Sequence, residues 1–279
     1  MRRFLQTFVA LRHRPVAVVG LALVLFWFAA ALLAPVLAPF DPLTPLKPFA
    51  KPGAAHGDAL LLLGADTVGR DILSRVLFGA RAVLLYAIGA TLLAYAVGVA
   101  AGLAAGYYRG RVDTVLSFGA NVVLSFPVLV LYILILTTVG ASGLNILLAV
   151  TVASAPGIMR VVRGLTLELR EREFVAAAKL RGDGAFYIML VEILPNVRGP
   201  LLVDACLRFG YVIITIGVLG FLGLGLPPPV PDWGSMIKEA RQVALAFPHM
   251  TLAPAVAISS LVLGFNLLAD GLRDLDGRG

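Results

Sequence analysis

Residues 83–108 read VLLYAIGATLLAYAVGVAAGLAAGYY, a run of 26 residues with no charged side chain. About 20 residues of helix cross the hydrocarbon core of a bilayer, which is about 30 Å thick. A helix satisfies all of its own backbone hydrogen bonds, as lipid requires. The run therefore predicts a transmembrane helix.

Five more runs of this kind occupy much of the remaining chain. They are Val16–Ala38, Val115–Val139, Leu144–Val162, Leu201–Gly225 and Leu252–Ala269. The chain is 59% hydrophobic and 14% charged, whereas soluble domains are roughly 45–50% apolar and about 25% charged. The first run is longer than the apolar region of a signal peptide, about 7–15 residues. The sequence predicts an all-α membrane protein with six transmembrane helices.

The basic residues predict the orientation of these helices, because Lys and Arg collect in cytoplasmic segments. With the N-terminus inside, 15 basic residues face the cytoplasm and seven face outward, while Arg208 lies within the fifth run. The outer seven are Lys47, Lys51, Arg70, Arg75, Arg81, Lys238 and Arg241. Both termini are predicted to be cytoplasmic. The net charge of +7 is therefore a topology signal rather than a sign of nucleic-acid binding.

Two long segments lie outside the apolar runs. Residues 40–82 begin with a proline-rich linker and end in an amphipathic stretch, Gly69–Arg81, which is predicted to be a short helix at the membrane surface. We therefore divide the chain into residues 1–82 (first helix, linker and interfacial helix) and residues 83–279 (core transmembrane domain with the second long segment). The second long segment, residues 165–198, is predicted to be cytoplasmic and is too long for a simple connection.

The cytoplasmic segment contains the sequence ELREREFVAAAKLRGDGAFYIMLVEILPN, residues 168–196. It predicts a helix over 169–180 that ends at Gly182, and a second helix from Ala185 that stops before Pro195. Ala176, Ala177 and Ala178 form a patch that lets another backbone approach closely. The patch is either a docking face for another protein or part of a helical pair that packs on its own membrane helices.

This segment resembles the coupling loop of bacterial ABC-importer permeases. Ala177 and Ala178 match the two alanines of that loop's motif, Gly182 its glycine, and Leu194-Pro195 its closing pair. Ala176 stands where the family has Glu, and Ile193 lies one place later than the motif's Ile. The resemblance implies docking of an ATPase on the following residues: Glu173, Phe174, Ala176, Ala177, Ala178, Lys179, Gly182, Asp183 and Pro195.

Other motifs narrow the resemblance to the second permease subunit of peptide and nickel importers. They are Arg14-Pro15, residues 37–42, residues 63–75, residues 79–81, residues 220–225, residues 231–234 and residues 264–274. The resemblance implies the type I importer fold and a multi-pass location in the bacterial inner membrane. It also implies transport of dipeptides or oligopeptides by alternating access.

The resemblance also implies the partners. They are a second homologous permease, two ATPase subunits that hold ATP and Mg, and an extracytoplasmic substrate-binding protein; the chain itself binds no cofactor. Because the sequence has no Walker A motif, GxxxxGK[ST], it is predicted not to hydrolyse ATP itself. The resemblance implies a transport subunit and not an enzyme. Cys206 is the single cysteine and the three histidines are scattered, so no metal site is expected.

Within the membrane, three glycines share one helix face at positions 98, 102 and 106. Small residues at this spacing let helices approach closely, and they predict a seam within the chain or against the partner permease. Pro127 is predicted to kink its helix, either as a hinge for alternating access or as a static bend.

Asp204 and Arg208 lie one turn apart in the fifth run and are predicted to pair. They either line the pathway and meet a charged peptide terminus, or brace the helix near the cytoplasmic interface. Position favours bracing. On the outer side, Trp233 is either a contact for the binding protein or an interfacial anchor. Asp66, Arg70 and Asp232 are the other candidate contacts for the binding protein.

The resemblance leaves the substrate open, and two other classes of membrane protein would show different sequence features. The substrate is a peptide, or else a nickel chelate or another small solute. A stand-alone secondary transporter would carry inverted repeats and more intramembrane charge. A membrane-embedded enzyme would carry a cluster of His or Asp at membrane depth, and the sequence has none.

Overall fold

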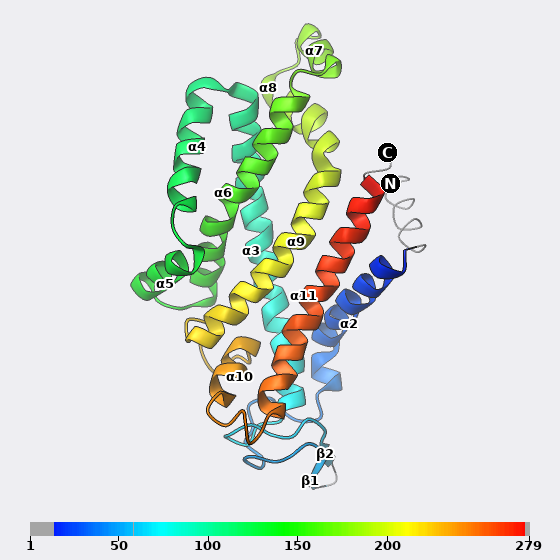
Figure 1. Cartoon of the computed structure of the whole chain (residues 1–279), viewed down its shortest axis with the longest axis vertical. Helices are drawn as coiled ribbons and strands as arrows, with labels where there is room; N and C mark the ends of the chain where they lie inside the picture. Colours follow the sequence, from blue (N-terminus) through cyan, green and yellow to red (C-terminus); the bar gives the residue numbers. More distant parts are fainter. Residues whose placement is uncertain (1–13, 58, 277–279) are drawn as a thin grey trace.

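A computed structural model describes residues 14–57 and 59–276, and these residues form an elongated helical bundle (Figure 1). Its helices are α2 Pro15–Leu37, α3 Ile72–Tyr108, α4 Gly110–Leu124, α5 Val128–Val139, α6 Gly143–Leu169, α7 Glu173–Leu180, α8 Ala185–Tyr187, the π-helix η1 Ile188–Ile193, α9 Leu194–Leu222, α10 Trp233–Ala240 and α11 His249–Asp276. The antiparallel strands β1 Ala54–His56 and β2 Ala59–Leu61 form a small hairpin. Predictions that involve Arg2, Arg3, Arg12, His13 and Arg278 lie outside the described residues.

Five stretches of the described chain are helical, apolar and long enough to cross a membrane. They are α2, α3, α6, Ala185–Leu222 and His249–Arg273. The third predicted span, residues 115–139, is instead the pair α4 and α5, bent by 88°. The all-helical prediction is therefore confirmed, and the span count is five, or six if the bent pair is one crossing.

The break between α4 and α5 falls at Ser125-Phe126-Pro127. Pro127 is the N-cap of α5 and has ψ 125°, which is outside the helical range. Proline has no backbone N–H and disfavours helical geometry in the residue before it, so the ladder of α4 stops here. α5 then runs across the bundle rather than along it (Figure 1).

The predicted surface helix over residues 69–81 is wrong, because these residues belong mainly to the first turns of α3. The Asp71 side chain caps α3 by accepting a 2.7 Å hydrogen bond from the Ser74 backbone N–H. From there α3 runs without interruption for 37 residues. Ile72 and Val76 are buried, and so is Arg75, whose charge is neutralised by partners described below. The predicted division after residue 82 falls inside this helix.

The predicted helix stop before Pro195 is also wrong. Pro195 is the second residue of α9 and lies inside a continuous helix, where a local π adjustment accommodates a proline. The π-helix η1 precedes it and connects α8 to α9, so that residues 185–222 form one helical span.

The three glycines form a seam within the chain. A Cβ at Gly98 would lie 2.7 Å from Ile158 Cβ, and one at Gly106 would lie 2.6 Å from Thr166 Cβ. Gly102 faces Val162 in the same way, at 2.6 Å. The α3 backbone therefore lies directly on α6, which places this seam within the chain and not against a partner.

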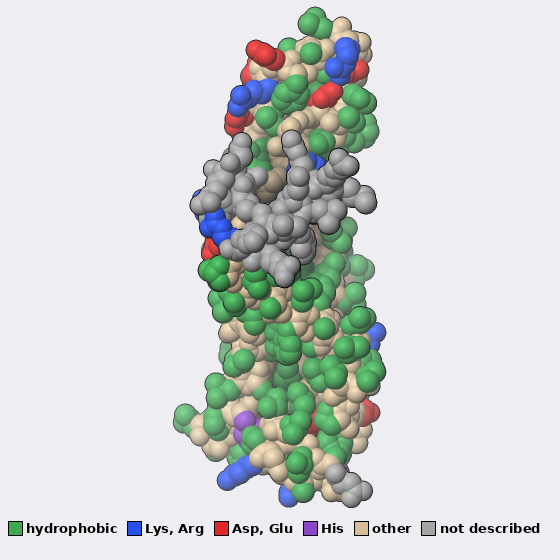
Figure 2. Space-filling model, turned by 90° about the vertical axis from the view of Figure 1, so that its right-hand side faces the viewer, with side chains coloured by type: hydrophobic (Ala, Val, Ile, Leu, Met, Phe, Trp, Pro, Cys, Tyr) green, Lys and Arg blue, Asp and Glu red, His purple; other side chains and the backbone are tan. Residues whose placement is uncertain are grey.

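The two ends of the bundle differ. α7 lies at one end, while α10 and the β-hairpin lie at the other (Figure 1). The start of α2 and the end of α11 both point toward the α7 end (Figure 1). On the face in Figure 2, hydrophobic side chains cover much of the middle of the bundle, and charged ones gather at the α7 end. This distribution suits a bundle surrounded by lipid along its length.

Candidate functional site

The loop between α6 and α9 is built around the short helix α7. α6 ends at Leu169, and Gly182, with φ +85°, terminates the turn after α7 in the left-handed conformation that glycine tolerates. Val175 and Ala178 are fully buried and share a core cluster with Ile188 and Ile193 of η1. One face of α7 is therefore fixed to the helix that continues into α9.

The opposite face of α7 is open. Ala176 and Ala177 are exposed, as are Glu173, Lys179 and Gly182. Among the other predicted docking residues, Pro195 is exposed, Phe174 and Asp183 are half-buried, and Ala178 is buried.

Large apolar side chains continue this open face. Leu180 is 89% exposed and Phe186 is 72% exposed. Arg181 donates hydrogen bonds to Asp183, at 2.7 Å, and to Glu192, at 2.8 Å, and so holds the turn against η1. Exposed apolar residues with a charged rim are typical of a protein-binding surface.

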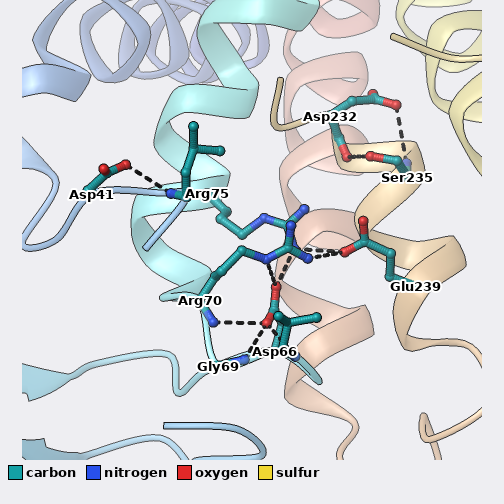
Figure 3. Close-up of polar contacts among 10 residues, drawn as sticks. Asp41, Asp66, Gly69, Arg70, Arg75, Asp232, Ser235 and Glu239 are labelled. Atoms are coloured by element: carbon teal, nitrogen blue, oxygen red, sulfur yellow. Dashed lines mark hydrogen bonds and ion pairs between the residues drawn. The ribbon is translucent and has the colours of Figure 1, made fainter. Parts of the chain in front are cut away.

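A network of charges lies at the opposite end (Figure 3). Asp66 Oδ1 accepts hydrogen bonds from the backbone N–H groups of Val68, Gly69 and Arg70, at 2.8–2.9 Å. Its Oδ2 accepts from Arg70 Nε, at 2.7 Å, and from Arg75.

Glu239 completes this network from α10. It accepts from Arg70 at 2.7 Å and from Arg75 at 2.8 Å. The four charges tie the outer linker to α3 and α10. Arg75 and Glu239 are absent from the sequence-based candidates, because their partners are distant in the chain and only Asp66 and Arg70 show a local spacing.

The predictions for Asp232 and Trp233 as contacts of a binding protein are wrong for their side chains, because both residues have zero exposure. Asp232 caps α10 through the N–H groups of Gly234 and Ser235. Burial raises the pKa of the Asp232 carboxyl to about 6. Trp233 Nε1 donates to the Val76 carbonyl at 2.9 Å, and its ring packs edge-on against Trp27 with centroids 5.0 Å apart. Trp233 is a core residue, not an interfacial anchor.

Asp204 and Arg208 are brought together within α9, as predicted. Arg208 Nε lies 2.7 Å from Asp204 Oδ2, and Tyr95 of α3 donates to the same oxygen at 2.5 Å. A Cβ at Gly157 of α6 would lie 3.0 Å from the Arg208 guanidinium. The pair therefore lies where α9 packs on α3 and α6, which agrees with a bracing role. The Tyr95 partner has no signal in the sequence.

These features define a class: a multi-pass membrane bundle with a partly anchored helical loop at one end, which is the form of a transporter's permease subunit. Residues 98–276 match the family described as binding-protein-dependent transport system inner membrane component. Residues 3–52 match the N-terminal transmembrane domain of oligopeptide transport permease C. The chain belongs to this permease family.

Three relatives show how far the similarity extends. The dipeptide transport system permease protein DppC of Haemophilus influenzae is 37% identical, with 92% of this chain and 88% of the relative aligned. The di/tripeptide transport system permease protein DppC of Pseudomonas aeruginosa is 35% identical, with 98% and 90% aligned. The glutathione transport system permease protein GsiD of Escherichia coli is 37% identical, with 94% and 86% aligned.

The chain is thus a multi-pass inner-membrane permease subunit of an ABC-type importer, and it is not an enzyme. A transporter of this family works with an ATPase partner and a substrate-binding protein, and the ATP and Mg belong to the ATPase.

Proposed function

We propose that this chain forms half of the translocation pathway for dipeptides and short oligopeptides, and that it works by alternating access. Its partners are a second homologous permease, two ATPase subunits and an extracytoplasmic binding protein. The observation that carries the proposal is the two-sided environment of α7. One face is buried against η1, and the other is exposed at the end of the bundle.

This environment makes α7 a mechanical link. An ATPase that holds the face of Ala177 and Leu180 moves Val175 and Ala178 with it. These two residues pack on η1 and therefore on the start of α9. Because close-packed cores shift between discrete arrangements rather than deform gradually, a displacement of α7 is passed to the membrane-spanning helices. In this proposal the α7 end is cytoplasmic, and the start of α2 and the end of α11, which point toward that end, lie on the same side.

The peptide substrate follows from the relatives. Two of those named above are described as dipeptide or di/tripeptide permeases, and the third as a glutathione permease. Glutathione is itself a small peptide with free carboxylates, so the three descriptions share one chemical class. None of the three names a nickel chelate.

A reconstituted transporter tests the proposal. The binding protein, both permeases and the ATPases are placed in proteoliposomes, and uptake of labelled Ala-Ala is measured together with ATP hydrolysis. Ala177→Glu buries an unpaired charge in the docking face, which costs roughly 2–5 kcal/mol. We expect the peptide transported per ATP to fall by about tenfold or more.

Ala177→Ser is the matched control, since it stays small and neutral, and it should retain coupling. Normal coupling in Ala177→Glu would refute the docking role of α7. Uptake by the unaltered transporter that continues without the ATPases, and that collapses with the proton gradient, would favour a secondary transporter.

A further inference from the structure

A second site lies at the end opposite α7, next to the charge network. It is a pocket of about 410 Å³ between the start of α3, the end of α9 and α10. The polar side chains that line it are Arg70, Arg75, Ser235, Lys238, Arg241 and Gln242, together with Glu239. This volume falls within the range of small-molecule sites, about 300–1,000 Å³.

The pocket carries an excess of positive charge. Arg70 and Arg75 are balanced by Asp66 and Glu239. Within residues 14–57 and 59–276, Lys238 and Arg241 contact no carboxylate. Lys238 and Arg241 are thus available to bind an anionic ligand.

Arg75, one of the lining residues, also has a donor below the surface that is unpartnered among the described residues. Arg75 is only 3% exposed, and its Nε has no hydrogen-bond partner within the described part of the chain. A buried guanidinium N–H without a partner costs free energy until an acceptor arrives. The lining therefore presents the positive charge of Lys238 and Arg241, while Glu239, the acidic residue of the lining, already accepts from both arginines.

The approach of Lys238 depends on a glycine. Gly223 ends α9 with φ +86°, and a Cβ at this position would collide with Lys238 Nζ. The Lys238 ammonium thus lies over the end of α9, and a side chain at position 223 would push this flexible group aside. The same glycine supplies the left-handed turn.

We propose that this pocket binds the free carboxylate of the peptide as it enters the permease pair. The inference rests on the proposed function and adds a recognition site to it. A carboxylate is the ligand that a guanidinium and an ammonium hold best, through charge-assisted hydrogen bonds. A partly enclosed pocket of this volume suits a small ligand better than the flat contact of a protein surface.

Binding to the assembled permease–ATPase complex, without the binding protein, tests this assignment. The complex in nanodiscs is titrated with Ala-Ala and with its C-terminal amide, and ligand-observed NMR reports both affinities. Because a hydrogen bond to a charged group contributes about 1.5–3 kcal/mol, the wild type should bind Ala-Ala about tenfold or more tightly than the amide.

The affinities of the wild type and of the Lys238→Gln/Arg241→Gln double variant for Ala-Ala and for its amide form a thermodynamic cycle. If Lys238 and Arg241 hold the carboxylate, the double variant binds the two peptides with affinities that differ by less than about threefold. Removing the cations and removing the carboxylate abolish the same interaction, so the two losses of affinity are not additive. Lys51→Gln removes an exposed cation outside the pocket and should discriminate like the wild type. Lys238→Arg/Arg241→Lys keeps both charges and should retain most of the discrimination.

Three results would overturn the assignment. The first is equal affinity of the wild type for both peptides, and the second is additive losses of affinity in the cycle. The third is a glutamine variant that still discriminates between the peptides but whose ATPase activity is no longer stimulated by the binding protein. The last would identify the pocket as a protein contact. Uptake of Ala-Ala by the wild-type transporter is measured separately, so failure of the proposed function and failure of the pocket are distinguishable.

Discussion

Replacing Gly102 by alanine should destabilise the α3–α6 seam. The added Cβ would lie 2.6 Å from Val162 Cβ and 2.7 Å from the Met159 carbonyl oxygen. Optimal carbon–carbon contacts are about 3.5–4.0 Å, so the two helices must separate by about 0.9 Å or more. Overpacking of this kind costs about 1–3 kcal/mol. Because Gly98 and Gly106 lie equally close to α6, the separation breaks contacts along the whole seam.

The measurement is thermal unfolding of the purified complex in detergent, with Gly164→Ala as the matched control. Gly164 lies in α6, and a Cβ there meets no atom of the described chain within 4 Å. The control should be as stable as the wild type or more stable, since alanine is the better helix former by up to about 1 kcal/mol. Equal midpoints for Gly102→Ala and Gly164→Ala would refute the assignment of the seam.

Two further predictions concern the end that carries α10. Asp66→Asn leaves Arg75 with one carboxylate and places an amide donor against two guanidinium groups, so it should cost about 3 kcal/mol of unfolding free energy, whereas the exposed Asp41→Asn should cost less than about 1 kcal/mol in the same assay. The Asp232 carboxyl has its pKa raised by burial to about 6, so the folded state binds this proton more tightly than the unfolded state. Its stabilising contribution is complete below the unfolded value of 3.8 and is lost as the pH rises through about 6. Acidification from pH 7.5 to 5 should therefore stabilise the wild type by about 1.4 kcal/mol more than Asp232→Asn, and parallel pH profiles for the two proteins would contradict the burial argument.

Five of the six predicted membrane spans are single helices in the structure, because the apolar runs leave the backbone no choice in lipid, whereas residues 115–139 are bent at Pro127. The residues at which the helices begin and end were harder to predict. Arg75 and Arg81 made residues 69–81 resemble a surface helix, yet Asp66 and Glu239 neutralise Arg75 from positions that the local pattern does not reveal. Pro195 resembles a helix stop, but the helix continues from η1 through Pro195 into α9, because a π adjustment accommodates the proline.

The coupling loop was easier to predict than the opposite end. In α7, the helix and the exposure of Ala176 and Ala177 agree with the sequence-based prediction, but Ala178, predicted as part of the docking patch, is buried against η1. Trp233 is buried only because Trp27 and the Val76 carbonyl meet it from elements far away in the chain. A lone aromatic residue in a proline-rich loop carries no information about such partners. Tertiary contacts therefore decided the role of this residue.

Site-directed cross-linking tests the central claim, that α7 is the ATPase docking element. A single cysteine replaces Ala177, or Lys51 at the opposite end, in a background where Cys206 is changed to Ser. The assembled transporter is then treated with a short bifunctional reagent. We expect Ala177→Cys to capture an ATPase subunit and Lys51→Cys to capture none. Capture of an ATPase from position 51 but not from position 177 would contradict the account.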